Sequence, residues 1–402
     1  MSPVILKNNL SEPNPDSHRP LPVAIQFSRF RGKDGVEEIQ WMIRPTEYAH
    51  FDIQLKWVRE AYEQAVQSMG LEMDSAVWRR FLCSDLINQE AALRGQSFSD
   101  PDVPNQNCAI SWVRQVPAPP SKVTLWASHL RIPGEKLSKS YNNRTLSLKR
   151  KDLTHHWSTG ITSPESVDSH AQTQGIFKKY GDFLKSEQMT LADHVVRTWF
   201  FVQNVDNNYA GMVDARNEVF EAEGLSADTH YIASTGIEGG YTDAPTNTLL
   251  DAYAIGGLKP EQIRYLHALK HLSPTHVYGV AFERATAIDY RDRTQIFISG
   301  TASIDDQGVT LHRGDIHRQL ERTLENIEAL LLEADATLDD MQVFIVYLRD
   351  PADEVVVRPE IARRFPELPF EIVTAPVCRP GWLIEIEGLA VIENDAQELP
   401  PF

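Results

Sequence analysis

The feature that most constrains the fold of this chain is an internal repeat in its second half. The segment HAQTQGIFKKYGDFLKSEQMTLADHVV, which begins at His170, aligns without a gap with HRQLERTLENIEALLLEADATLDDMQV, which begins at His317. Apolar residues of the second segment recur at helical spacing, which predicts an amphipathic helix in each copy. Each helix leads through TLAD or TLDD, a turn with capping chemistry, into the apolar run VVRTWFFV or QVFIVYL. Both runs are rich in β-branched and aromatic residues and predict buried strands.

The residues around this repeat predict one supersecondary unit, β-β-α-β-α-β-β. A hairpin precedes the first helix, and a polar turn with a shorter helix follows the buried strand. Two more strands then close the unit. In the middle copy, the shorter helix is predicted at 207–224. In the last copy, the hairpin is predicted at 280–289 and 295–304, the shorter helix at 353–365 and the closing strands at 369–377 and 382–392.

A third, degenerate copy is predicted in the N-terminal part of the chain. Its hairpin would be VAIQFSRF and EEIQWMIRP, its helix FDIQLKWVREAYEQAVQSM and its central strand SAVWRRFLCSD, with NCAISWVRQV and KVTLWASHL as closing strands. We therefore divide the chain into an N-terminal arm over 1–20, a degenerate unit over 21–150, a middle unit over 151–262 and a C-terminal unit over 263–397.

These units predict an α+β protein in which one chain imitates a trimer. Each unit would have a sheet with helices on one face, so its other face must be covered. Packing the three open faces together would bury them in one barrel-like core and would leave clefts between neighbouring units as pockets. Because the clefts would be complete within the chain, we expect a monomer.

Composition and charge narrow the class of protein. The formal net charge of −17 repels polyanions, so nucleic acid and membrane surfaces are not expected as partners. The basic stretch Lys136–Lys151 is interpreted as a solvated loop and strand, and no apolar run reaches the roughly 18 residues that span a bilayer. Cys83, Cys108 and Cys378 show neither CxxC nor Cys/His spacing, so we expect no disulfide scaffold and no metal site. With no signal-peptide pattern at the N-terminus, this predicts a cytoplasmic protein.

The unit resembles a known family. With ISGTASID, QLERTLENIEALL, VYLRD and APVCRPGWLIEIEGLAV, it is similar to the Rid (YjgF-like) superfamily, whose chorismate-mutase-like subunits form trimers with ligand sites at their interfaces. The runs RTWFFVQNVDNNYAGMVDARNEVFEAEGL, THYIASTGIEG and LKPEQIRYLHALKHLSPTHVYGVAFERA resemble the chorismatases of that superfamily, over about 154–394. The resemblance implies tandem Rid-like units packed as an intramolecular pseudo-trimer. It also implies hydrolysis of chorismate to pyruvate and either a dihydroxycyclohexadiene carboxylate or a hydroxybenzoate, with no metal and no organic cofactor.

Cleavage of the enolpyruvyl ether needs a general acid that protonates the enol methylene. The site must also hold two carboxylates and exclude water. Glu385 is the candidate acid, because it lies in the apolar strand LIEIEGLAV, where burial would raise its pKa. Strand alternation places Glu387 on the same face, so spacing leaves the two glutamates as alternatives. The family resemblance favours Glu385.

Several further residues are candidates for substrate binding. Arginine meets a carboxylate with a planar pair of donors, and small residues let backbone amides approach a ligand. Tyrosines could donate a hydroxyl or form a ring wall. On these grounds, and in segments that match the family, we select Arg216, Arg284 and Arg379 as carboxylate clamps, Tyr209 and Tyr265 as tyrosines, Thr235 and Gly236 in ASTGIEGG, and Ser299, Gly300 and Thr301 in ISGTA.

Two positions bear on the product and disagree. Cys378 resembles the hydroxybenzoate-forming members of the family, so it is a candidate catalytic residue. Ala285, after FER, resembles the members that release the diene diol. We favour 3-hydroxybenzoate, with 4-hydroxybenzoate as a possible second product.

Two other functions compete with this interpretation. One is an imine or enamine deaminase of the Rid type, but that class clamps its substrate with an arginine near the start of the penultimate strand, where this chain has PFEIVTAP. The other is a non-catalytic protein that binds a small acid. The sequence lacks G-x-S-x-G, HExxH, P-loop and GxGxxG motifs, which argues against serine hydrolases, zinc proteases and nucleotide-binding proteins.

Overall fold

The strands of the chain form three sheets that follow one plan. The computed structural model describes residues 20–402, so the arm predicted over 1–20 lies outside the described residues except for its last position. The strand orders are β1-β2-β6-β3-β4, β7-β8-β9-β12-β10-β11 and β13-β14-β15-β18-β16-β17-β5. In each sheet a hairpin is followed by the last strand of the unit, then by the central strand, and then by a strand parallel to the central one. The fold is therefore α+β, as predicted, with a repeated sheet.

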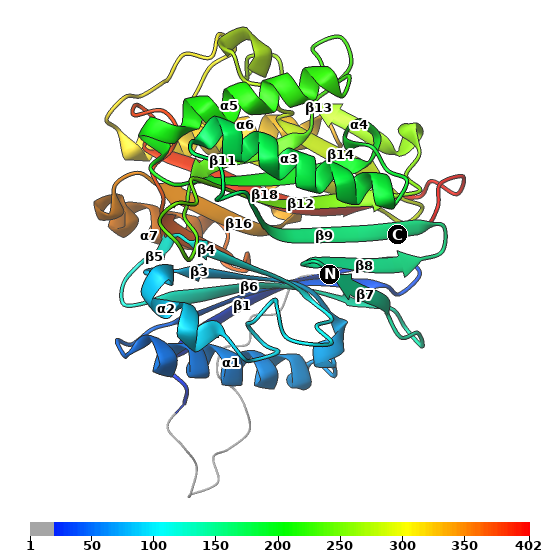
Figure 1. The fold of residues 1–402 in the computed structure, drawn as a ribbon, viewed down its shortest axis with the longest axis vertical. Helices are drawn as coiled ribbons and strands as arrows, with labels where there is room; N and C mark the ends of the chain where they lie inside the picture. The colour runs from blue at the N-terminus through cyan, green and yellow to red at the C-terminus, as the bar shows by residue number, and fades with distance from the viewer. Residues whose placement is uncertain (1–19) are drawn as a thin grey trace, which may run out of the picture.

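The N-terminal sheet packs one long helix on its outer side, where α1 lies below the strands in Figure 1. Its elements are β1 (Val23–Arg31), β2 (Glu37–Pro45), α1 (Phe51–Ser68), β3 (Ala76–Cys83), α2 (Leu86–Leu93), β4 (Ala109–Arg114) and β6 (Val123–Arg131). These elements match the degenerate third copy and add the short helix α2, for which no prediction was made.

The middle sheet carries two helices of equal length, α3 and α5, on its outer side (Figure 1). Its elements are β7 (Ser138–Asn142), β8 (Thr145–Arg150), β9 (Leu153–Thr162), α3 (Ser169–Ser186), α4 (Leu191–His194), β10 (Val195–Val202), α5 (Val205–Ala222), β11 (Ala233–Glu238) and β12 (Thr248–Gly256). The prediction of a shorter second helix is wrong for this copy, since α3 and α5 each span 18 residues. The TLAD turn caps as predicted, because the Thr190 hydroxyl accepts a hydrogen bond from the Asp193 amide.

The C-terminal sheet is the longest and draws one strand from the N-terminal part of the chain. Its elements are β13 (Ile263–Leu266), β14 (Ala285–Asp289), β15 (Arg293–Ala302), α6 (Ile316–Leu332), β16 (Met341–Leu348), α7 (Glu354–Arg364), β17 (Phe370–Thr374), β18 (Ile384–Glu393) and, paired to β17, β5 (Val116–Pro117). The first strand of the predicted hairpin, β14, begins at Ala285 and not at Val280.

The predicted boundary between the first two units at residues 150 and 151 is wrong for the sheets. Strands β7 and β8 pair with β9 and so belong to the middle sheet. Polar and lysine-rich residues conceal this hairpin in the sequence, and of its apolar side chains only Leu146 and Leu148 are fully buried. The stretch Lys136–Lys151 is therefore largely a β-hairpin, where a solvated loop and strand were predicted.

A repeated irregularity fixes how the three units correspond. In each one, the central strand has an extra residue near its start, opposite the last strand of the unit. These β-bulges lie between Ala76 and Trp78, between Val195 and Arg197, and between Met341 and Val343. Bulges interrupt pairing at defined positions, so their alignment gives an internal register for the repeat.

The inner faces of the sheets meet in one common core. A single hydrophobic cluster contains buried side chains of all three sheets, and a second lies beneath α3 and α5. Strand β4 packs against β9, β11 against β15, and β1 against β16, so the three sheets close on one another. This closure is the intramolecular pseudo-trimer that the repeat predicted.

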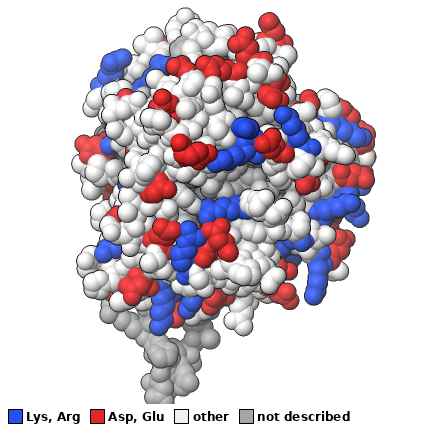
Figure 2. All heavy atoms as spheres, viewed as in Figure 1, with Lys and Arg blue, Asp and Glu red and all other residues white. Residues whose placement is uncertain are grey.

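Acidic and basic side chains are interspersed over the face seen in Figure 2. Within the basic stretch, Lys139 donates to two backbone carbonyls, and the guanidinium of Arg150 pairs with Asp34 at 3.0 Å. Arg144 pairs with Asp102 at 2.5 Å. No helix within residues 20–402 is both long and apolar enough to cross a bilayer.

Candidate active site

One cleft between the middle and C-terminal sheets gathers most of the predicted site residues. Its cavity volume is about 30 Å³. Its walls come from α5, β11, β15, β18 and the segments before β14 and after β17. The predicted residues that line it are Tyr209, Arg216, Thr235, Gly236, Arg284, Gly300, Cys378, Arg379 and Glu385.

Glu385 lies at the inner wall of this cleft and is 4% exposed. Burial raises the pKa of its carboxyl to about 8, and the negative charge of Glu387 acts in the same direction. The positive charges of Arg197 and Arg284 oppose this rise in the pKa. Glu385 therefore holds its proton at neutral pH, which is the state that a general acid requires.

Gly300 on β15 allows the carboxyl group of Glu385 to occupy this position. A Cβ atom at residue 300 would stand 2.1 Å from Oε1 of Glu385 and 3.1 Å from Cγ2 of Thr235. Any side chain at this position would displace the carboxyl group or the opposite wall. Glycine is therefore required at position 300 because a side chain there would occupy the space of the Glu385 carboxyl group.

The structure separates the two glutamates that strand alternation left equivalent. Oε2 of Glu387 forms an ion pair with Nη2 of Arg197 at 2.7 Å, and its Oε1 accepts a hydrogen bond from Nε1 of Trp199 at 2.9 Å. Both oxygens of Glu387 are held by the middle unit, whereas Glu385 lines the cleft. Only Glu385 is placed to meet a ligand there.

Three arginines from three segments make the cleft positive opposite the acid. Arg216 on α5 and Arg284 before β14 are both almost fully buried, at 1% and 4% exposure. Their guanidinium groups lie 6.0 Å and 5.2 Å from the ring centroid of Phe282, and Arg379 lies 5.1 Å from that of Trp382. Buried guanidinium groups stacked on aromatic rings are suited to the binding of carboxylates.

Tyr209 and Cys378 complete the wall around the acid as neutral groups. Burial raises the pKa of the Tyr209 hydroxyl well above its usual value. Burial, together with the charge of Glu385, raises the pKa of the Cys378 thiol to about 12. At neutral pH, Cys378 is therefore a thiol and lacks the thiolate that nucleophilic catalysis needs.

Two predicted residues lie away from the cleft lining. Tyr265 is on β13 and stacks on His230, with ring centroids 4.3 Å apart. Ala285 is fully buried at the start of β14, where it pairs with Ile298. Neither residue is among those that line the cleft.

Ser299 and Thr301 support the cleft wall and do not line it. Both are fully buried on either side of Gly300. The Ser299 hydroxyl donates to the Glu283 carbonyl at 2.6 Å and accepts from the Ser234 amide at 2.9 Å, which joins β15 to β11. Alternation along β15 explains the difference, because only every second side chain points to one face.

Sequence reasoning missed part of the lining. Phe282 and Trp382 lie within the quoted motifs AFERA and PGW, so the motifs contained a signal that was not used. The other lining residues that were not predicted have small or apolar side chains, which gave no signal in the sequence: Ser234, Val280, Ala302 and Ile304. Among residues 20–402, no three His, Cys, Asp or Glu side chains are grouped so as to hold a metal ion.

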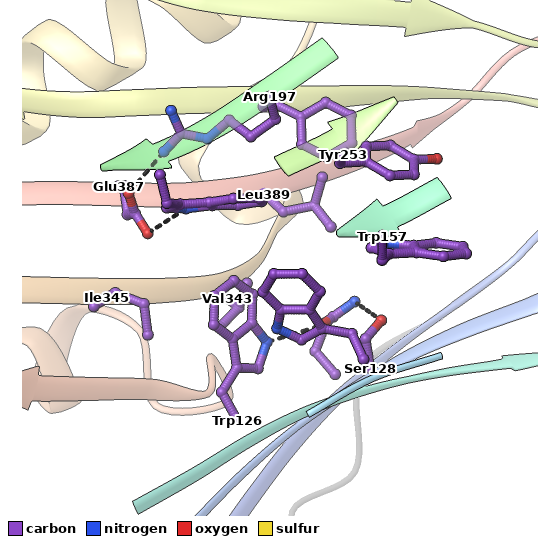
Figure 3. Close-up of a pocket in the computed structure, with 14 residues that line it drawn as sticks. Trp126, Ser128, Trp157, Arg197, Tyr253, Val343, Ile345, Glu387 and Leu389 are labelled. Carbon is purple, nitrogen blue, oxygen red and sulfur yellow. Dashed lines mark hydrogen bonds and ion pairs between the residues drawn. The ribbon is translucent and has the colours of Figure 1, made fainter. Parts of the chain in front are cut away.

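A second cavity, of about 60 Å³, lies where the three sheets meet (Figure 3). The aligned bulges show that its lining repeats three times, once from each unit. The equivalent sets are Trp78, Arg197 and Val343; Ser128, Tyr253 and Leu389; and Gln40, Trp157 and Phe297. This cavity therefore marks the pseudo-threefold axis, and Glu387 lies between it and the cleft.

The same register explains why one cleft of three carries an acid. Glu385 is opposite Tyr347 in the C-terminal sheet. The equivalent positions are Leu249 in the middle sheet and Thr124 in the N-terminal sheet. Leu249 has no proton to donate, and the Thr124 hydroxyl is bound to Oε2 of Glu371 at 2.8 Å. The repeat has thus kept an acidic side chain at this position in only one of its three copies.

Comparison with known proteins places the chain in a family. The family model described as Endoribonuclease L-PSP matches residues 284–392, and a RutC family protein of Pyrococcus abyssi is 36% identical over 100 residues, 24% of this chain and 79% of the relative. A 3-hydroxybenzoate synthase of Streptomyces hygroscopicus is 30% identical over 49% of this chain, and the match spans only 63% of that relative. A chorismatase crystal structure has a similar fold, with a TM-score of 0.58 and 19% identity over 79% of this chain and 93% of that chain. The chain therefore belongs to the RutC family of the Rid superfamily, and it is similar in sequence and in fold to proteins named 3-hydroxybenzoate synthase or chorismatase.

Proposed function

We propose that the chain is a chorismatase, which cleaves the enolpyruvyl ether of chorismate and releases pyruvate. The observation that carries the proposal is the pairing of a protonated, buried carboxyl group with three arginines in one cleft. Burial of Glu385 raises its pKa to about 8, and Arg216, Arg284 and Arg379 line the same walls. A dicarboxylate with an acid-labile enol ether matches both features.

In the proposed reaction, Glu385 transfers its proton to the methylene carbon of the enolpyruvyl group. The ether carbon then gains oxocarbenium character, and a hydroxyl oxygen attacks it or the ring carbon that bears the ether. The C–O bond breaks, and Glu385 recovers a proton from the attacking hydroxyl. Buried arginines bind the two carboxylates throughout, and the walls of the cleft exclude bulk water. The chemistry needs no metal or organic cofactor, and we propose that none is used.

We favour a hydroxybenzoate, chiefly 3-hydroxybenzoate, as the second product. Cys378 lines the cleft next to Glu385, whereas Ala285 is buried behind it. The marker that contacts the ligand space is thus the one that resembles the hydroxybenzoate formers. The name of the Streptomyces hygroscopicus relative points to the same product. Formation of a hydroxybenzoate and pyruvate from chorismate consumes no net water, because the loss of ring hydroxyl as water balances hydrolysis of the ether.

The test is to mix the purified protein with chorismate and follow pyruvate with a coupled dehydrogenase, while chromatography identifies the ring product. Glu385→Gln is the informative variant, and Glu393→Gln is its matched control, because Glu393 is exposed at the end of the same strand. We expect pyruvate and a hydroxybenzoate from the wild type and from E393Q, and at least about a hundredfold slower turnover in E385Q.

Each outcome has a defined consequence. Release of pyruvate together with a diene diol would support the proposed chorismatase activity and would contradict the proposal that the second product is a hydroxybenzoate. No pyruvate from the folded wild type would refute the proposal. In that case, release of ammonia from an imine would favour a Rid-type deaminase, and binding of a small acid without turnover would favour a binding protein.

We also propose that the chain acts as a cytoplasmic monomer. Residues of the middle and C-terminal sheets complete the cleft within one chain, so a second copy has nothing to add to it. A mass near 45.5 kDa by light scattering is expected for a monomer, whereas a multiple of it would contradict this part of the proposal.

A further inference from the structure

A buried charge pair lies directly behind the wall of the cleft and joins two units. Arg197 on β10 and Glu387 on β18 are 1% and 2% exposed. Figure 3 shows Arg197 reaching the Glu387 carboxylate. The other oxygen of this carboxylate accepts a hydrogen bond from Nε1 of Trp199 at 2.9 Å. The Glu387 carboxylate thus meets a cation at one oxygen and an indole N–H at the other.

The same guanidinium group reaches the cleft. Nη2 of Arg197 also donates to the Thr235 hydroxyl oxygen at 2.5 Å, and that oxygen accepts a second hydrogen bond from the Gly300 amide at 2.9 Å. Thr235 and Gly300 line the cleft, and Gly300 lies against the Glu385 carboxyl group. Arg197 thus connects the buried pair to two walls of the site.

We infer that Arg197 and Glu387 form a positioning pair for the proposed acid: Arg197 fixes the wall of Thr235 and Gly300, and Glu387 holds a negative charge beside Glu385. The inference rests on the proposed function only for the use of Glu385 as an acid. Neither member of the pair touches the substrate. Their effect is exerted through the geometry of the wall and through the proton affinity of Glu385.

The charged and titratable groups around Glu385 define the sign of the effect. Burial and the charge of Glu387 raise its pKa, while Arg197 and Arg284 lower it. The other titratable groups that face Glu385 or Glu387 are neutral tyrosine and cysteine side chains and one further arginine behind the pair: Tyr209 on α5, Cys378 after β17, Tyr347 on β16 and Arg80 on β3. Removal of the charge of Glu387 leaves the cationic groups in place, so Glu385 must become more acidic.

The size of the effect follows from the strand geometry. Two residues on the same face of one strand lie about 7 Å apart. At that distance, and at an effective dielectric constant of about 20, one unit charge changes a neighbouring pKa by roughly one to two units. Neutralising Glu387 should therefore lower the pH at which Glu385 loses its proton by about the same amount.

The experiment compares Glu387→Gln with a matched control, Asp251→Asn. Asp251 is the equivalent residue of the middle unit, is fully buried, and pairs with Arg80 at 2.9 Å across the other interface. It lines neither cavity described above. The titration of Glu385 is followed by NMR of ¹³C-labelled glutamate carboxyl groups, with the signal assigned by its loss in E385Q, and the alkaline limb of the chorismate pH profile is recorded in parallel.

We expect both readouts to move to lower pH by about one to two units in E387Q and to stay in place in D251N and in the charge-preserving E387D. An unchanged titration in E387Q, or an equal shift in D251N, would overturn the inference. If E387Q does not fold, R197M/E387M replaces the pair with apolar side chains of similar length, a change that buried pairs often tolerate. That variant should still shift the titration downward, because Glu387 raises the pKa more than Arg197 lowers it. A shifted titration in a protein that does not turn over chorismate would refute the proposed function and leave this inference standing.

Discussion

The raised pKa of Glu385 predicts that its removal stabilises the protein in a pH-dependent way. The ordinary pKa of a glutamate is 4.5, and that of Glu385 in the fold is about 8. Between these values the folded state holds a proton that the unfolded state has released. The free energy of unfolding of the wild type therefore falls by about 1.4 kcal/mol per pH unit from this group alone as the pH rises through this window. Below pH 4.5 both states are protonated, and the loss is absent.

Glu385→Gln keeps the shape of the protonated acid and removes the titration. We expect the variant to match the wild type within about 1 kcal/mol at pH 5 and to exceed its free energy of unfolding by roughly 3 to 5 kcal/mol at pH 9. Activity should change in the opposite direction, since the proton donor is lost. Such an exchange of stability for function is common at active sites.

The measurement is chemical denaturation at pH 5, 6, 7, 8 and 9, followed by tryptophan fluorescence, for which the chain offers eight indoles. Taking the difference between E385Q and the wild type cancels the titration of every other group. Glu393→Gln is the control, because the exposed Glu393 should give a difference near zero at each pH. A difference between E385Q and wild type that is flat across this range would refute a raised pKa at Glu385, and with it the electrostatic basis of the proposed acid.

Three further predictions concern the cleft. Gly300→Ala places a Cβ atom against Oε1 of Glu385, so we expect at least about a hundredfold loss of kcat/KM in a folded protein. Gly181→Ala on α3, which meets nothing within 4 Å, should instead keep its activity and gain roughly 0.5–1 kcal/mol in denaturation; equal activity in the two variants would contradict the role of Gly300. Arg379→Met should lower kcat/KM for chorismate by about 10- to 100-fold at an unchanged melting temperature, and an unchanged KM would exclude Arg379 as a carboxylate clamp. Cys378→Ala should retain pyruvate release but alter the ratio of hydroxybenzoate to diene diol on chromatography, whereas an identical product ratio would remove Cys378 from the account of product choice.

Most of the fold could be predicted from the internal repeat, because the spacing of apolar residues and the capping residues of helices are local properties of a sequence. The helix at His317 and the turn TLDD could be recognised without tertiary information. The hairpin of β7 and β8 could not, since its lysines and asparagines are typical of a loop and its partner strand is chosen by the packing of the whole unit. The second helix of the middle copy was predicted to be shorter than the first, whereas α3 and α5 are equally long at 18 residues.

The candidate site also has a part that the sequence could predict and a part that required the tertiary structure. Glu385 could be selected from an acid in an apolar strand, but its distinction from Glu387 needed the position of Arg197, which lies far away in the sequence. Side chains such as Ser299 and Thr301 share a motif with Gly300, yet face the opposite side of β15. A motif thus located the wall of the cleft, and only the register of the strand assigned each of its residues to the ligand side or the support side.

Each contact between neighbouring units uses a different buried carboxylate. Arg80 meets Asp251 between the first two units, Arg197 meets Glu387 between the next two, and Arg358 and Thr124 meet Glu371 where the last unit returns to the first. A unit docked in the wrong place would bury Asp251 or Glu387 without its arginine, at a cost of several kcal/mol, whereas Glu371 would keep Arg358 of its own unit and lose only the Thr124 hydroxyl. The three contacts between units therefore differ in their residues, and together they favour one cyclic order of the units. The same unit supplied by a second copy of the chain would satisfy the same contacts, so they select the order of the units and not the chain from which each unit comes.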